Sequence, residues 1–205
     1  MSLFQVYNLL VLVYNNPGIS ISGGAFMKSF SVRALVLGAL FAALLAVCSW
    51  ISVPAAVPFT LQTFAVFLTL LLLPARQGIL AIAVYLLLGA VGLPVFSGFR
   101  GGPSALFGPT GGYLTGFLLT GLSALAFEKL HWTCFPLKLF GLVLGLLLCY
   151  AAGTAWFVRT YTAGPMTVGK ALSLCVLPFL IPDGIKLALA ALIARRTAPL
   201  IAKLG

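Results

Sequence analysis

Charged side chains are scarce in this chain, and acidic ones are almost absent. Only 7% of the 205 residues are charged, with 12 lysines and arginines, 2 acidic residues and 1 histidine. A soluble domain carries about 25% charged residues, so this composition excludes one. It also leaves too few groups for a catalytic triad or a metal cluster, and we expect no catalysis, no metal and no cofactor.

Cysteine pairs and nucleotide-binding motifs are missing as well. The four cysteines form no Cys-x-x-Cys motif, and three of them lie inside apolar runs, which predicts buried thiols. Residues 164–170 (GPMTVGK) match the first seven positions of a P-loop, but Ala171 stands where Ser or Thr must bind magnesium. The chain therefore has no means of using ATP by itself, and any energised process requires a partner.

What the chain has instead is long apolar runs. Hydrophobic residues make up 62% of it, and most of the cations behind its net charge of +10 lie singly or in pairs at the ends of these runs. That placement marks membrane topology and argues against nucleic-acid binding. We predict an all-α integral membrane protein, a compact bundle of six transmembrane helices. The predicted spans are 33–53, 61–73, 79–93, 113–127, 139–158 and 171–194.

Three of these spans are shorter than the others. The second, third and fourth fall below the about 20 residues that a full crossing needs. Either their ends extend into the flanking Pro/Gly segments, or these helices lie inside the bundle. Before the first span, residues 1–26 form an N-terminal extension, a tail or an interfacial segment, and 27–205 form a single transmembrane domain.

The cations predict the orientation. The cations predicted on one side of the bundle are Lys28, Arg33, Arg76, Lys129, Lys138, Arg195, Arg196 and Lys203. Those predicted on the other side are Arg100, Arg159 and Lys170. By the positive-inside rule, both termini are cytoplasmic. The Gly/Pro-rich loop 93–113 is then on the outer face. Because lipid cannot satisfy irregular backbone, this longest non-helical stretch must lie at a surface or line a cavity, and it is the first candidate for a ligand site.

Two helices carry small residues at every fourth position, a spacing that lets helices approach closely in lipid. The stripes are Ala34, Gly38, Ala42 and Ala46 in the first span, and Gly141, Gly145, Cys149 and Gly153 in the fifth. For the fifth helix we expect packing inside the bundle. For the first, docking onto another subunit is an equal alternative.

Asp183 and Lys186 lie well inside the last span. Their spacing places both side chains on one face of a helix. Each charge near the bilayer centre costs about 2.5 to 3.5 kcal/mol, so such residues normally face a cavity, a partner or a substrate. Pro178 and Pro182 are expected to kink or interrupt the helix just before Asp183. The alternatives are a structural ion pair and a polar binding site.

Taken together, the motifs closely resemble those of the BioY family, the biotin-binding S components of energy-coupling factor (ECF) transporters. They occur in the family's order between Arg33 and Arg196. The motifs are 58–64 (PFTLQTF), 92–96 (GLPVF), 101–102 (GG), 108–117 (GPTGGYLTGF), 178–180 (PFL) and the Asp183-x-x-Lys186 pair.

The resemblance implies a multi-pass subunit of the bacterial cytoplasmic membrane, surrounded by lipid, that binds biotin from outside as the transported ligand. It would associate with a transmembrane coupling subunit and two ATPase subunits, and topple to release biotin inward. Family members meet the coupling subunit through an Ala-x-x-x-Ala face on the first helix. Both Ala39/Ala43 and Ala42/Ala46 fit this spacing here.

The resemblance also implies a biotin site. The Asp-x-x-Lys pair contacts the ureido ring in the family, so Asp183 would accept from its N–H groups and Lys186 would donate to its oxygen. The other predicted members are Gln62, Tyr113, Phe96, Ser97, Gly98, Gly101 and Gly102, the glycines allowing close backbone approach. Arg100 departs from the small or uncharged residue expected there; it either holds the valerate carboxylate or is solvated.

Two rival functions follow from the same residues. An S component for a different vitamin would share the six-helix scaffold. A small intramembrane enzyme would use Asp183 as acid or base, but it would lack a second acid and a histidine in the membrane.

Overall fold

The structure is a computed structural model that describes residues 32–54, 57–130, 134–162, 164 and 166–203. The predicted extension 1–26 lies outside these residues, and so does Lys28. The described part is mostly helical, with one small two-stranded sheet.

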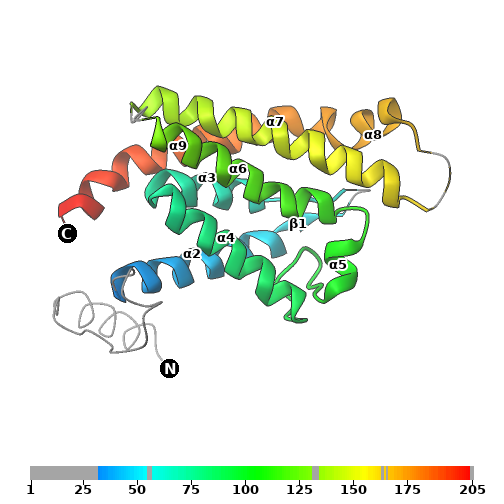
Figure 1. Cartoon of the computed structure of the whole chain (residues 1–205), viewed down its shortest axis with the longest axis horizontal. Coiled ribbons are helices and arrows are strands. Elements are labelled where there is room, and N and C mark those ends of the chain that lie inside the picture. The colour runs from blue at the N-terminus through cyan, green and yellow to red at the C-terminus, as the bar shows by residue number, and fades with distance from the viewer. Residues whose placement is uncertain (1–31, 55–56, 131–133, 163, 165, 204–205) are drawn as a thin grey trace.

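The six predicted spans are all present as helices, and the predicted helical bundle is confirmed (Figure 1). Three spans are long and apolar enough to cross a membrane on their own: Val32–Trp50, Phe135–Thr160 and Val168–Thr197. The spans correspond to α2 (Val32–Trp50), α3 (Gln62–Leu72), α4 (Ala75–Ala90), α6 (Gly111–Lys129), α7 (Phe135–Thr160), and α8 (Val168–Cys175) with α9 (Leu177–Lys203).

Helix α3 is the innermost element. Its 11 residues are about 16 Å long, roughly half the thickness of the hydrocarbon core. It contacts α2, α4, α6 and α9, and seven of its residues are buried. Of the three short spans, α3 therefore lies inside the bundle. Helix α6 extends beyond its predicted span at both ends, whereas α4 begins before residue 79, as Ala75 is its first residue, but ends at Ala90, short of the predicted residue 93. The first turn of α3 carries Gln62 and Thr63.

The last span is interrupted, but not where the prolines predicted. Helix α8 ends at Cys175 and α9 begins at Leu177, with Val176 between them at φ −123° and ψ −57°. Pro178 occupies the first turn of α9, where a missing N–H is tolerated, and the helix continues through Pro182. Asp183 thus lies in the second turn of a restarted helix, close to its N-terminal end as expected.

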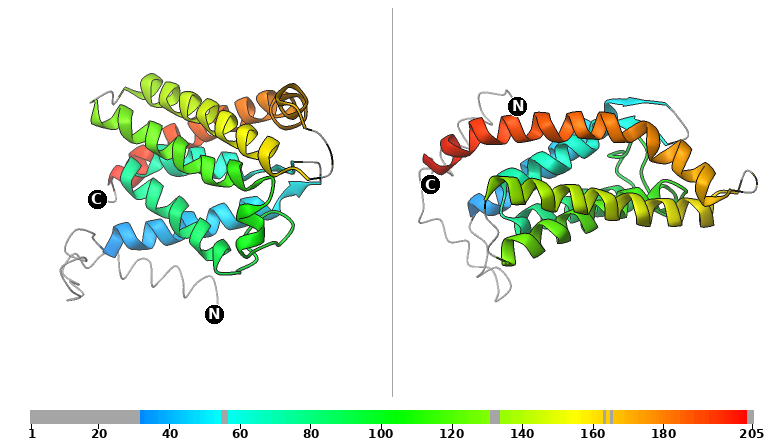
Figure 2. Two further views of the ribbon diagram at one scale, coloured as in Figure 1. Left: turned by 45° about the vertical axis from the view of Figure 1, so that its right-hand side comes forward. Right: turned by 90° about the horizontal axis from the view of Figure 1, so that it is seen from above.

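Two further elements lie at one end of the bundle. Strands β1 (Ser52–Val53) and β2 (Phe59–Thr60) form an antiparallel hairpin between α2 and α3, where the first span was predicted to remain helical to residue 53. The loop expected to be wholly non-helical contains the short helix α5 (Pro103–Phe107). Both lie at the end opposite the start of α2 and the end of α9 (Figures 1 and 2).

The small-residue stripe of α7 packs against α6, as predicted. A Cβ added to Gly145 would lie 2.6 Å from Cα of Thr120, and one added to Gly153 would lie 2.2 Å from the ring of Tyr113. The hydroxyl of Thr120 also donates to the Gly145 carbonyl oxygen at 3.2 Å. Along this face the backbones of α6 and α7 approach each other closely, because glycine leaves no side chain between them.

Helix α2 presents its two alanine pairs to different surroundings. Ala42 and Ala46 are buried, with 2% and 8% of their surface exposed. Ala39 and Ala43 are exposed on the outer side of the helix. Only the Ala39/Ala43 pair is therefore free to meet another subunit; its docking role remains a prediction.

Candidate binding site

A cavity of about 210 Å³ lies between α3, α6, α7 and the α8–α9 span. The connection between β1 and β2 and the loop after α4 complete its walls, with Val57, Pro58 and Ser97 among the lining residues. Its lining is mostly apolar with a few polar groups, which is the usual composition of a small-molecule site.

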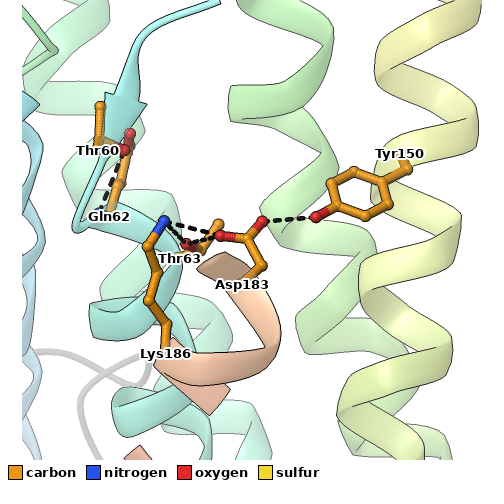
Figure 3. Close-up of polar contacts among 6 residues, drawn as sticks. All are labelled: Thr60, Gln62, Thr63, Tyr150, Asp183 and Lys186. Atoms are coloured by element: carbon orange, nitrogen blue, oxygen red, sulfur yellow. Dashed lines mark hydrogen bonds and ion pairs between the residues drawn. The ribbon is translucent and has the colours of Figure 1, made fainter. Parts of the chain in front are cut away.

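Asp183 is the polar centre of this cavity, and three side chains satisfy its carboxylate (Figure 3). Oδ1 accepts from the Thr63 hydroxyl at 2.8 Å and from Lys186 Nζ at 2.7 Å, and Oδ2 accepts from the Tyr150 hydroxyl at 2.6 Å. Only 2% of the Asp183 side chain is exposed. These contacts compensate the cost of burying a charge.

Thr63 joins the two members of the ion pair. Its hydroxyl accepts from Lys186 Nζ at 3.0 Å while it donates to Asp183, so the three groups form a closed triangle. An ammonium group has three N–H donors. Two of those on Lys186 are used by the described residues, which leaves one for a ligand in the cavity.

Aromatic rings form the apolar walls. Phe59 of the hairpin stacks on Phe179 at 4.1 Å between ring centroids, and Phe179 lines the cavity. Phe96 from the loop packs edge-on against Tyr85 at 5.5 Å. The Tyr113 hydroxyl is hydrogen-bonded to the Thr154 hydroxyl at 3.0 Å, and Tyr113 lines the cavity. Aromatic rings thus supply much of the apolar surface of the cavity.

The structure brings together seven of the ten residues predicted for the site. Asp183, Lys186, Arg100, Gln62, Tyr113, Phe96 and Ser97 all line the cavity. Arg100 is exposed at the rim. Gln62 is buried, and its amide nitrogen donates to the Tyr85 hydroxyl at 2.7 Å, so one of its donors is already used.

The three predicted glycines are not among the lining residues, and turn geometry accounts for them. Gly98 and Gly102 have φ of 70° and 89°, which side chains disfavour. A Cβ on Gly101 would lie 2.2 Å from the Leu93 carbonyl oxygen. The loop's own folding thus explains these glycines, and their close approach to a ligand stays a prediction.

Sequence reasoning missed Thr63, Tyr150 and Phe179. Thr63 and Phe179 lie inside two of the quoted motifs, and Thr63 directly follows the predicted residue Gln62. Tyr150 carries a hydroxyl group within an apolar span, and this polar group was the one local indication that the residue contributes to a site. Its partner Asp183 is 33 residues away, so only the packing of α7 against the last span reveals the contact.

Comparison with known proteins agrees with this architecture. The model of the BioY family matches residues 25–203. The biotin transporter BioY of Thermotoga maritima is 46% identical over 170 residues, covering 80% of this chain and 95% of the relative. A probable biotin transporter BioY of Pyrococcus horikoshii is 41% identical over 166 residues, with the same coverage.

A solved structure has the same fold. The crystal structure of the S-component for biotin from an ECF-type ABC transporter aligns with a TM-score of 0.72 and 26% identity, over 80% of this chain and 90% of that one. The apolar spans and these matches identify a membrane protein of a transporter family. The chain belongs to the BioY family.

Proposed function

We propose that this chain captures biotin from outside the cell as the S component of an ECF-type transporter. The observation that carries the proposal is the buried Asp183–Lys186 pair at the floor of an aromatic-walled cavity. The names of its relatives and of the aligned S-component support the same ligand.

The two ends of biotin differ in chemistry, and the cavity offers a partner for each. The remaining donor of Lys186 suits the ureido oxygen, and the Asp183 carboxylate suits a ureido N–H. The rings fit between Phe179 and the loop. Arg100 at the rim takes the valerate carboxylate, because a guanidinium binds a carboxylate with two parallel hydrogen bonds.

Uptake requires partners that the chain does not contain. We propose that a transmembrane coupling subunit and ATPase subunits energise it in the cytoplasmic membrane of a bacterium, with both termini inside. The exposed Ala39/Ala43 pair of α2 is the docking face.

The purified protein tests the ligand. Biotin should co-purify with it, and in titrations biotin should bind more tightly than dethiobiotin, with thiamine and riboflavin failing to bind. Tight binding of another vitamin instead would contradict the proposal and favour the rival S component. Mass spectrometry of biotin recovered after incubation should show it unchanged, and a modified product would favour the enzyme.

Arg100→Gln should weaken biotin binding about tenfold. A hydrogen bond to a charged group contributes about 1.5 to 3 kcal/mol, and exposure at the rim reduces this contribution. Titration of the variant against biotin and against biotinamide checks the contact. Because biotinamide lacks the carboxylate, wild type and variant should bind it equally.

Arg159→Gln is the matched control for this change. Arg159 is an exposed cation near the same end of the bundle, at the end of α7, and does not line the cavity. An equal loss of biotin affinity in both variants would show a general electrostatic effect and would exclude a contact between Arg100 and the carboxylate.

A further inference from the structure

The loop between α4 and α6 shapes much of the cavity. We call residues 93–110 the ligand loop; it supplies eight lining residues, among them Phe96, Ser97 and Arg100. The loop has only five helical residues of its own, those of α5. Its position against the cavity therefore depends on contacts from neighbouring elements.

A tryptophan of α2 holds the first part of the ligand loop. Trp50 Nε1 donates to the Pro94 carbonyl oxygen at 2.8 Å, and its ring stacks on Phe99 at 5.2 Å between centroids. Phe99 has φ of 56°, a conformation that is unfavourable for a bulky residue. The stack thus helps to hold Phe99 in this conformation. The neighbouring Ser49 hydroxyl also donates to the Val95 carbonyl oxygen.

A tryptophan of α7 holds the other end. Trp156 Nε1 donates to the Gly108 carbonyl oxygen at 3.0 Å. The start of α6 lies directly against this side chain, because a Cβ on Gly112 would be 2.3 Å from the Trp156 Cβ. Gly108 and the two residues that follow it line the cavity. The contact therefore fixes the segment that forms this wall.

Both contacts have the same chemistry and come from two different helices, α2 and α7. An indole N–H is a donor only, carried on a large apolar ring, and it binds a backbone carbonyl without competing for a second partner. Between the two ends, the Gly102 N–H donates to the Gly89 carbonyl oxygen at 2.7 Å and anchors the middle of the loop to α4. Opening the loop at either end must break one indole hydrogen bond.

We propose that Trp50 and Trp156 are positioning residues that clamp the two ends of the ligand loop over the cavity, so that each slows release of the bound ligand. The proposal rests on the proposed biotin function. Neither side chain lines the cavity, so both act through the loop.

Trp50→Phe and Trp156→Phe test the clamp, because phenylalanine keeps an aromatic ring but removes the N–H donor together with part of the ring surface. Release of labelled biotin into excess unlabelled biotin should be about two- to tenfold faster in each variant, the factor expected for one net hydrogen bond. The double variant should show the product of the two factors, since the contacts are at separate ends. Thr197→Val, which removes a hydroxyl contact to Ile193 near the far end of α9, is the control and should release biotin at the wild-type rate.

Hydrogen exchange of the ligand-free protein provides a readout that does not depend on biotin. The Phe96 N–H donates to the Arg100 carbonyl oxygen near Trp50, and the Gly111 N–H donates to the Gly108 carbonyl oxygen that also accepts from Trp156. Exchange should be about two- to tenfold faster at Phe96 in Trp50→Phe and at Gly111 in Trp156→Phe. Exchange in the middle of α7 should stay unchanged.

The outcomes separate this inference from the proposed function. Unchanged release in either tryptophan variant, with normal biotin binding by the wild type, would overturn the two-ended clamp and leave the function intact. Failure of the wild type to bind biotin would overturn the function, and faster exchange in both variants would still support the clamp.

Discussion

Asp183→Asn should reduce biotin affinity by at least 100-fold while leaving the protein folded. The variant removes the negative charge that pairs with Lys186 Nζ at 2.7 Å. The Lys186 side chain, which is only 12% exposed, is then left without its counter-ion. Removing one member of a buried pair lowers folding stability by about 3 to 5 kcal/mol, so the variant should be less stable than wild type but still folded. The ureido N–H groups also lose a charged acceptor. Isothermal titration in detergent measures the affinity, and gel filtration with circular dichroism checks the fold.

Glu128→Gln is the matched control, because Glu128 is the other acidic residue of the chain. It is exposed at the opposite end of the bundle and accepts from the Ala75 N–H at 2.8 Å, a contact that glutamine can retain. Biotin binding should not change. Wild-type affinity in Asp183→Asn would remove Asp183 from the site.

A double variant distinguishes a binding pair from a merely structural one. Asp183→Asn combined with Lys186→Met removes both charges, and replacing a buried pair by neutral groups of similar size is often neutral for stability. Thermal stability should recover relative to Asp183→Asn alone, but biotin affinity should not. Recovery of both would mean that the pair only supports the fold.

Local patterns predicted the features that depend on neighbouring residues. Apolar runs bounded by Pro, Gly and charge located the six helices, and the three-residue spacing of Asp183 and Lys186 placed them on one face. The contacts that complete the site are not local. Thr63 meets Asp183 across 120 positions of sequence, and only the packing of α3 against α9 brings them together.

Proline and glycine were the least reliable signals. Pro182 leaves α9 unbroken, and the interruption lies at Val176, just before Pro178 in the first turn of α9 and not directly before Asp183. Glycines of the loop suggested room for a ligand, yet Gly101 faces the Leu93 carbonyl oxygen. A glycine signals close approach of some neighbour, and the sequence alone does not say which one.

Ala43→Trp should abolish biotin uptake while leaving biotin binding unchanged. Ala43 is exposed on α2 beside Ala39, and a helix pair in lipid relies on small residues for close approach. An indole at this position would separate the two helices, and no hydrophobic gain would offset the lost contact. Uptake of labelled biotin is measured in cells that co-express the coupling and ATPase subunits of the same organism. Co-purification of those subunits with the variant should also be lost.

Leu147→Trp on α7 is the matched control, because it adds an indole to another exposed apolar position; it should leave uptake and assembly intact.

Ala42→Trp tests the buried pair of α2. Ala42 is 2% exposed, so the indole would have to enter the core and the variant should lose both fold and binding. Normal uptake by Ala43→Trp would place the docking face elsewhere. The Ala42/Ala46 pair would not replace it, because those side chains already pack inside the bundle.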